Sequence, residues 1–336
     1  MKKVSIIIPV YNMEDWVESG IKCITEQTYE NLEIIIVDDG SKDNSYMKCL
    51  AEADKDRRIA VFSKNNEGPG AARNLALRKA TGDYIYFFDI DDYLEKNAIE
   101  KFARYMENEN TDLVVCSFSM FDGEKVFRTV KKADGLKRTG GDARKDYYEH
   151  MFMYGERGIQ GAAWFKLYKT DIIRKNGIEF PKLRKSEDDV FVARYVNCID
   201  SFYMTGDVLC RYYVNSYKRF WDKYRFDIFD TSRQSTMYVK DIVLSWNRNN
   251  KDVLQRIYDD YFHKTFGSFC FLFNPNLKLN RKARYARLKE ITDIFMDDIS
   301  CDGIEINHPI FKCMKKKNYR AIYVRIVLHI WKHKFD

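Results

Sequence analysis

The stretch Gly82–Leu94, GDYIYFFDIDDYL, decides the fold, because an apolar run ends there abruptly in Asp89, Asp91 and Asp92. The run predicts a buried strand over Tyr84–Phe88 that delivers three acids at its carboxyl end. Carboxylates this close repel one another unless a cation lies between them. Mg²⁺ or Mn²⁺ with oxygen ligands is the usual cation, although an acidic surface turn has the same pattern in isolation.

Three further apolar runs precede this strand, and each is followed by a segment with helical character. These runs are Val4–Val10, Glu33–Val37 and Ile59–Ser63. Short strands that alternate with helices predict β-α-β units, a mostly parallel sheet with helices on both faces, and right-handed crossovers. Asn12 is expected to cap the helix that follows the first strand.

Polar residues collect at the carboxyl ends of these predicted strands. In open α/β sheets the ligand lies outside those ends. The convergence therefore predicts a binding crevice lined by Pro9, Tyr11, Asp38, Asp39, Asp89 and Asp91.

The regular alternation stops after about residue 110, which predicts a mixed sheet beyond that point. Leu113–Phe121 and Lys125–Val130 read as a hairpin, and Trp164–Tyr168 as another strand. Ser186 is expected to cap a helix that begins with three acids. From about Trp221 the sequence changes to long aromatic helices, so we expect an α/β domain over 1–220 and an all-α region over 221–336.

A glycine-containing loop, Gly68–Arg73, has a superficial likeness to a dinucleotide-binding loop. That fingerprint follows the first strand and precedes its ribose-binding acid by about 20 residues. Here Asp39 comes before the glycines, so a nicotinamide enzyme is disfavoured. We interpret Gly70 as allowing close backbone approach and Arg73 as a permanently charged donor, with a solvated helix arginine as the alternative.

With these residues laid out, the chain resembles the inverting family 2 glycosyltransferases, which have the GT-A fold and use nucleotide-sugar donors. The resemblance covers roughly residues 1 to 215 in the order of the family's motifs. The matching segments are SIIIPVYN (5–12), EIIIVDDGSKDNS (33–45), NEGPGAARNLAL (66–77), GDYIYFFDIDD (82–92), WFKLYKTDII (164–173) and SEDDVFVARY (186–195).

The resemblance implies a role for each matching residue. Asp89 is expected near the ribose, and Asp91, together with Asp89, near an Mn²⁺ or Mg²⁺ ion that bridges the diphosphate. Asp188 matches the acid proposed as catalytic base, with Glu187 supporting it, although acids at a helix N-terminus also complement the helix dipole. The positions that match the nucleotide-binding part of the family are Pro9, Tyr11, Asn12, Asp39, Asn66, Gly70 and Arg73.

Some assignments stay open. Arg211, Lys218 and Arg219 are candidates for a basic partner of the diphosphate or acceptor, and Asp189 competes with Asp188 as base. Two rival functions also remain: a sugar-nucleotide nucleotidyltransferase, whose usual early glycine-rich basic loop is missing, and a non-catalytic binding protein that kept the fold. The acceptor expected from family habits is a glycan or a lipid-linked glycan of a bacterial surface polysaccharide.

The net charge of +7 comes from the end of the chain, since residues 312–336 hold eight Lys or Arg and one acid. The balanced remainder disfavours a nucleic-acid partner. No apolar run is long enough to span a bilayer, so we expect a cytoplasmic protein. Residues 311–335 form a basic, aromatic segment that suits the inner membrane surface, and docking on the protein's own helices is the alternative.

Overall fold

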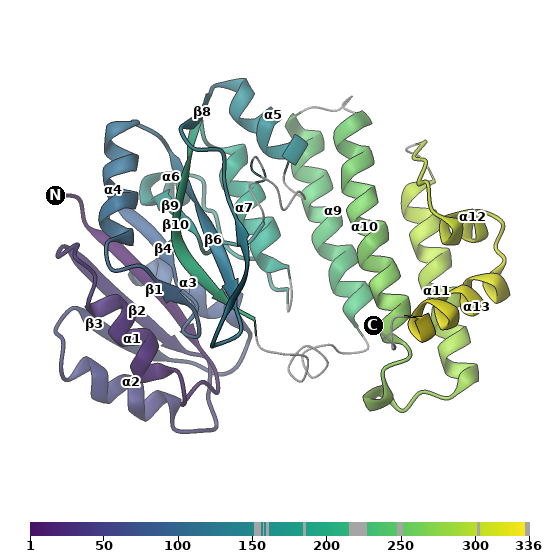
Figure 1. The fold of residues 1–336 in the computed structure, drawn as a ribbon, viewed down its shortest axis with the longest axis horizontal. Coiled ribbons are helices and arrows are strands. Elements are labelled where there is room, and N and C mark those ends of the chain that lie inside the picture. Colours follow the sequence, from purple (N-terminus) through teal and green to yellow (C-terminus); the bar gives the residue numbers. More distant parts are fainter. Residues whose placement is uncertain are drawn as a thin grey trace. The chain divides into compact units, whose positions relative to one another are not determined.

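The computed structural model describes residues 1–150, 156, 158, 161–183, 186–214, 227–246, 251–300 and 303–332. The chain divides into two compact units, Met1–Asn215 and Ser216–Asp336. The first is an α/β unit and the second is helical (Figure 1). Residue 221, where the sequence predicted the change of character, lies outside the described residues.

In the described part of the first unit, ten strands form one sheet in the order β3-β2-β1-β4-β9-β6-β10-β5, with β7 beside β6 and β8 beside β10. Strands β1 to β4 are mutually parallel, as predicted. The chain moves from β1 to β2 and β3 and then returns to place β4 on the other side of β1. This reversal creates a switch point between β1 and β4, which is where open α/β sheets bind ligands. The four strands are β1 (Val4–Val10), β2 (Leu32–Asp38), β3 (Ile59–Ser63) and β4 (Tyr84–Phe87).

Helices cover both faces of the sheet, as side chains on β4 show. Because successive strand residues point to opposite faces of the sheet, Tyr86 and Phe87 contact helices on opposite faces. Tyr86 lies against Phe102 of α4, whereas Phe87 lies edge-on against Phe191 of α7. The helices of this unit are α1 (Val17–Thr25), α2 (Ser45–Ala53), α3 (Pro69–Lys79), α4 (Ala98–Asn108), α5 (Gly141–His150), α6 (Thr170–Lys175) and α7 (Glu187–Asn197).

The second half of the sheet is mixed, as predicted, because β9 runs antiparallel to both β4 and β6. Two short strands escaped sequence analysis, since neither β5 nor β8 has an apolar run of its own. Strand β10 is a single long strand over Ser201–Tyr213. These strands are β5 (Tyr93–Leu94), β6 (Leu113–Phe121), β7 (Val126–Val130), β8 (Leu136–Thr139), β9 (Lys166–Lys169) and β10 (Ser201–Tyr213).

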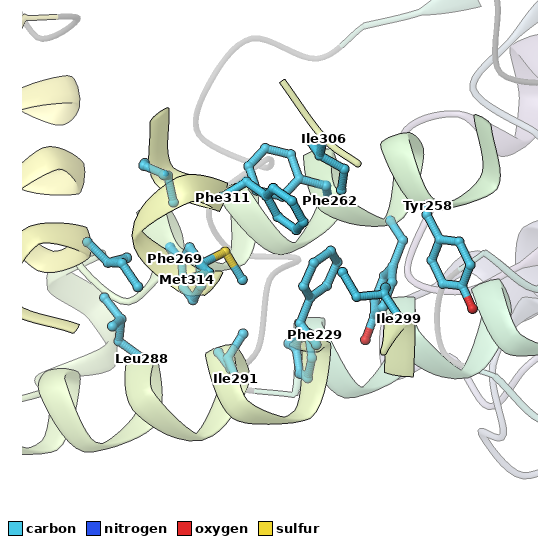
Figure 2. Packing of buried hydrophobic residues seen from close by; sticks show 14 of the residues in the cluster. Phe229, Tyr258, Phe262, Phe269, Leu288, Ile291, Ile299, Ile306, Phe311 and Met314 are labelled. Atoms are coloured by element: carbon cyan, nitrogen blue, oxygen red, sulfur yellow. The ribbon is translucent and has the colours of Figure 1, made fainter. Parts of the chain in front are cut away.

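The helical unit has its own core, in which aromatic and aliphatic residues from each of its described α-helices meet (Figure 2). Phe229, Phe262 and Phe311 come from three different helices and are almost completely buried. The unit contains α9 (Ile228–Trp246), α10 (Lys251–Phe271), the 3₁₀ turn η1 (Pro275–Leu277), α11 (Arg281–Ile299), α12 (Pro309–Lys315) and α13 (Tyr319–Lys332).

Helix α13 contributes one face to this core and presents the other to solvent. Ile322 and Ile326 are fully buried in the cluster. Large apolar side chains on the opposite face are exposed, namely Val324, Val327, Leu328 and Trp331. Across the described residues, every helix is too short or too polar to cross a bilayer.

Gly20 couples helix α1 to the acidic segment after β4. A Cβ atom at Gly20 would lie 2.3 Å from the backbone oxygen of Ile90 and 2.7 Å from its Cδ1 atom. Only a residue without a side chain therefore lets the backbone between Asp89 and Asp91 pack directly on α1.

We predict that Gly20→Ala destabilises the protein although alanine favours helices by about 1 kcal/mol over glycine. Overpacking against backbone typically costs about 1 to 3 kcal/mol, which should outweigh that gain and leave a net loss measurable by urea unfolding. Gly267→Ala is the matched control, because a Cβ at that helical glycine meets nothing within 4 Å and the variant should gain stability. Equal responses of the two variants would contradict this packing.

Candidate active site

A buried arginine lies at the centre of the site. Arg73 projects from α3. Gly68, with φ +97°, precedes this helix, and Pro69 is its first residue. Nη1 of Arg73 donates to Glu187 Oε1 and Asp188 Oδ1, each at 3.0 Å, and its Nη2 donates to Asp89 Oδ1 at 2.8 Å. The guanidinium also lies 5.4 Å from the ring centroid of Phe180. One cation thus joins acids from the end of β4 and the start of α7.

The charges in this cluster do not balance, since three carboxylates surround one guanidinium. Burial raises the pKa of Glu187 to about 7, helped by the charge of Asp188 and opposed by Arg73. Burial also raises the pKa of Asp188, again against the effect of Arg73. Burial alone would lower the pKa of Arg73, but the three acids raise it above its ordinary value. The cluster therefore has acids that hold protons more readily than usual beside a permanent cation.

Asp92, in the acidic segment after β4, is partly exposed as a residue, but its Oδ2 atom is buried. Asp92 accepts a hydrogen bond from the Tyr213 backbone amide at 2.9 Å, while its Oδ2 has no hydrogen-bond partner among the residues that the structure describes. Burial and the charges of Asp89 and Asp91 raise the Asp92 pKa well above its ordinary value. Within the described part of the chain, no group of three or more His, Cys, Asp or Glu side chains is arranged to hold a metal by itself. Hard-cation sites completed by substrate phosphates need only one or two carboxylates, so the acids present fit that type of site.

Asn12 joins the loops that follow β1 and β2, and its predicted helix cap was wrong. Helix α1 begins at Val17, four residues after the expected start. Asn12 instead adopts a left-handed conformation (φ +51°), which asparagine tolerates better than most residues. The backbone amide of Asn12 donates to Ser41 Oγ at 3.0 Å, and its side-chain Oδ1 accepts from the Lys42 backbone amide at 2.8 Å. Pro9 and Tyr11 precede Asn12 in the sequence. Pro9 is partly buried and Tyr11 is exposed.

Asp39 holds the loop between β3 and α3. Its Oδ1 accepts from Lys64 Nζ and from the Glu67 amide, both at 3.1 Å, and its Oδ2 accepts from the Gly68 amide at 2.7 Å. Asn66 lies exposed within this loop. Asp39 therefore connects the end of β2 to the loop that leads into the Arg73 helix.

Gly70 packs against protein. A Cβ atom there would lie 3.1 Å from Glu187 Cγ and 3.2 Å from Phe180 Cβ. Arg211, one of the proposed basic partners, binds Glu95, with its Nη2 atom 2.8 Å from Glu95 Oε1. Lys218 and Arg219, the other proposed basic partners, lie outside the described residues.

Helix α7 starts without the predicted serine cap. Ser186 occupies the position before the helix with φ +60°, and its side chain makes no capping hydrogen bond. The start of the helix is held instead by Arg73 and by the Ala163 amide, which donates to Asp188 Oδ2 at 3.2 Å.

Sequence analysis missed two buried lysines near this helix, Lys132 and Lys166. Lys166 is completely buried on the central strand β9 and Lys132 is 3% exposed. The signal was present, because a lysine inside the apolar run WFKLY cannot be a surface residue if that run is a buried strand.

The switch point, the mixed sheet and the acids at the strand ends define a protein of the GT-A type. Residues 5–175 match the family model described as glycosyl transferase family 2, and the chain belongs to that family. The resemblance identified from the sequence motifs is therefore confirmed.

Curated relatives match the chain over part of their length. EpsH of Bacillus subtilis is 34% identical over 194 residues, 57% of this chain and 55% of EpsH. An uncharacterized glycosyltransferase of Haemophilus influenzae is 39% identical over 150 residues, 43% of this chain and 60% of the relative. The poly(ribitol-phosphate) beta-glucosyltransferase of Bacillus spizizenii is 31% identical over 194 residues, 56% of this chain and 28% of that enzyme. The matched region thus spans little more than half of the first two relatives.

Solved structures share the fold over nearly the whole chain. Staphylococcus aureus TarS 1–349 in complex with UDP-GlcNAc has a TM-score of 0.67 at 18% identity, covering 98% of this chain and 92% of that chain. The mannosyltransferase PcManGT of Pyrobaculum calidifontis, in complex with GDP-Man and Mn²⁺, has a TM-score of 0.55 at 15% identity, covering 98% and 88%. The predicted fold, a GT-A α/β unit followed by a helical region, is confirmed.

Glu187 gives a pH-dependent stability prediction. Its folded pKa of about 7 exceeds the ordinary value of 4.5, so the folded state binds more protons than the unfolded state between these pH values. Folding stability contributed by Glu187 is therefore highest below about pH 4.5 and is lost as the pH rises through 7.

We expect Glu187→Gln to gain stability relative to the parent protein as the pH is raised from 5 to 8, by up to roughly 3 kcal/mol at about 1.4 kcal/mol per pKa unit. Urea unfolding at several pH values measures this difference. Glu179→Gln changes an exposed acid of the same type and serves as the control. A difference that does not grow with pH would show that Glu187 is already ionised at low pH.

Proposed function

We propose that this protein transfers a sugar from a nucleotide-diphosphate donor, most suitably a UDP-sugar, to a hydroxyl group of a glycan or lipid-linked acceptor, with inversion at the anomeric carbon. The observation that carries the proposal is the Arg73 cluster. A single guanidinium contacts Asp89, on the strand end assigned to the donor, and Asp188, the acid assigned to the acceptor. Direct transfer needs these two partial sites side by side.

The comparisons support the substrate classes. Structures of TarS contain UDP and UDP-GlcNAc, and the Bacillus spizizenii relative is named as a glucosyltransferase acting on poly(ribitol-phosphate). These names favour a UDP-sugar donor and a polymeric surface acceptor.

In the proposed reaction Asp188 accepts the proton of the acceptor hydroxyl as its oxygen attacks the anomeric carbon. The bond from that carbon to the diphosphate oxygen breaks on the opposite side, and the nucleoside diphosphate leaves with the electron pair. One displacement inverts the configuration. Burial of Asp188, which raises its pKa, makes it a better proton acceptor. Glu187 shares the Arg73 Nη1 contact and so limits how strongly Arg73 can neutralise Asp188.

The donor side is assigned to residues at the ends of β1 and β2 and to the loop before α3. Asn12 and Asp39 act there by holding the two loops in register, beside Pro9, Tyr11 and Asn66. Gly70 is also assigned to the donor side, where its missing side chain makes room for Glu187 and Phe180.

Asp89 and Asp91 would hold a divalent cation, Mn²⁺ or Mg²⁺, which would neutralise the negative charge of the leaving diphosphate. The donor chemistry fits, since carboxylate oxygens at a strand end are hard ligands that substrate phosphates can complete. The PcManGT structure, which contains Mn²⁺ and GDP-Man, supports a metal in this fold.

Nucleotide release tests the proposal. The full chain is incubated with UDP-glucose, UDP-galactose, UDP-GlcNAc or GDP-mannose, with Mn²⁺ and a bacterial lipid and glycan extract as acceptor. We expect one donor to be turned over, and Asp188→Asn to lower the rate by about 10² to 10⁴ while donor affinity persists. Asp189→Asn is the matched variant. If Asp189→Asn is the slower of the two, the base is Asp189, and absence of release from every donor would argue for a binding protein.

Metal removal and Asp91→Asn should weaken donor binding together, because either change leaves the diphosphate charge uncompensated. Calorimetric titration of UDP into the protein, once in the presence of Mn²⁺ and once with excess EDTA, measures the change in UDP affinity. Asp122→Asn, on an exposed turn, is a control. Unchanged UDP affinity in EDTA would refute the metal assignment.

We also propose that helix α13 lies against the anionic inner surface of the membrane, near a lipid-linked acceptor. Its four exposed apolar residues have the spacing i, i+3, i+4, i+7 and therefore form one stripe. Exposed lysines and arginines lie around it at Lys315, Lys316, Lys317, Arg320, Arg325 and Lys332. A shallow apolar stripe with basic neighbours suits an interface rather than a span.

Flotation with vesicles tests this placement. The full chain should bind phosphatidylglycerol-containing vesicles in a salt-sensitive way and bind phosphatidylcholine vesicles weakly. Leu328→Ser with Trp331→Ser should reduce binding by about tenfold or more, since burying each side chain is worth roughly 1.5 to 3 kcal/mol. Phe127→Ser removes an exposed aromatic side chain from the first unit and should bind like the parent. If both variants float equally, the stripe has another purpose.

A further inference from the structure

One peptide group connects the buried lysine of β9 to the proposed base. Lys166 Nζ donates to the carbonyl oxygen of Ala162 at 2.5 Å, and the amide of Ala163 donates to Asp188 Oδ2 at 3.2 Å. That carbonyl and that amide belong to the same planar, conjugated peptide bond. Lys166 and Asp188 therefore lie at opposite ends of a single short hydrogen-bonded chain.

The segment that carries this peptide is fixed from several directions. Tyr168, also on β9, donates from its hydroxyl to the Ala163 carbonyl at 2.9 Å. A Cβ atom at Gly161 would lie 1.8 Å from Asp189 Oδ1, so the segment passes directly against the first turn of α7. Strand β9 thus uses two of its own side chains to hold the preceding backbone against the acids.

Burying Lys166 carries a cost that packing alone does not explain. Lysine is almost never fully buried without a partner, yet this side chain is completely enclosed. Its Nζ lies 3.5 Å from the ring centroid of Phe165, which favours a cation there. Burial and the nearby Lys132 lower its pKa well below the ordinary value. An apolar residue would fill the same space without that penalty.

We propose that Lys166 is a positioning residue for Asp188, acting through the peptide bond between Ala162 and Ala163. This inference rests on the proposed role of Asp188. A carbonyl that accepts a strong hydrogen bond makes the attached amide a better donor, because hydrogen bonds in a chain polarise one another. Lys166 thereby anchors Oδ2 of Asp188, while Arg73 contacts Oδ1, and the carboxylate plane is fixed by both ends.

Lys132 provides a matched comparison within the same protein. It too is buried, and its Nζ donates to the carbonyl of Gly158. Burial lowers its pKa to about 8. The peptide it contacts is not the one that touches Asp188, so removing Lys132 tests the general effect of losing a buried lysine here.

A double-mutant cycle tests the proposal with the donor that the wild-type chain turns over best. Lys166→Met should lower kcat for nucleotide release by about tenfold, the size expected for the loss of one buried hydrogen bond, with the KM for the sugar donor unchanged. In the Asp188→Asn background the same substitution should have no further effect. Lys132→Met should leave kcat within about twofold, and Lys166→Gln, which keeps a donor, should recover part of the loss.

An equal loss in both backgrounds, or an equal loss in Lys132→Met, would overturn the proposal. Amide hydrogen exchange gives a readout without turnover, since Lys166→Met should accelerate exchange at Ala163 and Lys132→Met should not. If Asp188→Asn keeps its full rate, the base assignment fails. Unchanged exchange at Ala163 in Lys166→Met refutes the positioning role by itself.

Discussion

The α/β unit depends on the ion pairs that Arg73 makes with Asp89, Glu187 and Asp188. These acids are 16, 114 and 115 residues away in sequence, so the contacts tie α3 to the end of β4 and to the start of α7. Without a cation, three carboxylates would not share a buried space, because each charge would be both desolvated and repelled. The Phe180 ring encloses the guanidinium from another side.

This constraint gives the site its chemical character. A buried charge network is rarely the most stable packing of a core, but it fixes which groups lie together. Here it brings a strand-end acid suited to a diphosphate and its metal next to an acid suited to proton transfer. Burial, together with the excess of carboxylates over cations, raises the pKa of Glu187 and Asp188, as suits a proton acceptor in a neutral solution. The same buried charge network around Arg73 thus lowers the stability of the fold and supports the proposed function.

Much of this could be predicted from the sequence. The buried strands β1, β2 and β4 are continuous apolar runs, and acids at their ends must meet because parallel strands end at one edge. Contacts made by long-range packing were missed. Asparagine and serine are common helix-capping residues, but tertiary contacts place Asn12 and Ser186 in left-handed conformations. Strands β5 and β8 exist only because β10 pairs with them. Lys166 lies within the segment WFKLYKTDII, but its contact with Ala162 depends on the turn before β9, which the sequence pattern does not reveal.

The most direct test of the central claim is the free energy of unfolding of Arg73→Met beside that of a variant that also carries Glu187→Gln and Asp188→Asn. If Arg73 is present to neutralise these acids, Arg73→Met alone should lose about 3 to 5 kcal/mol, as expected when one partner of a buried ion pair is removed. The combined variant should recover most of that loss. A combined variant no more stable than Arg73→Met would contradict the account.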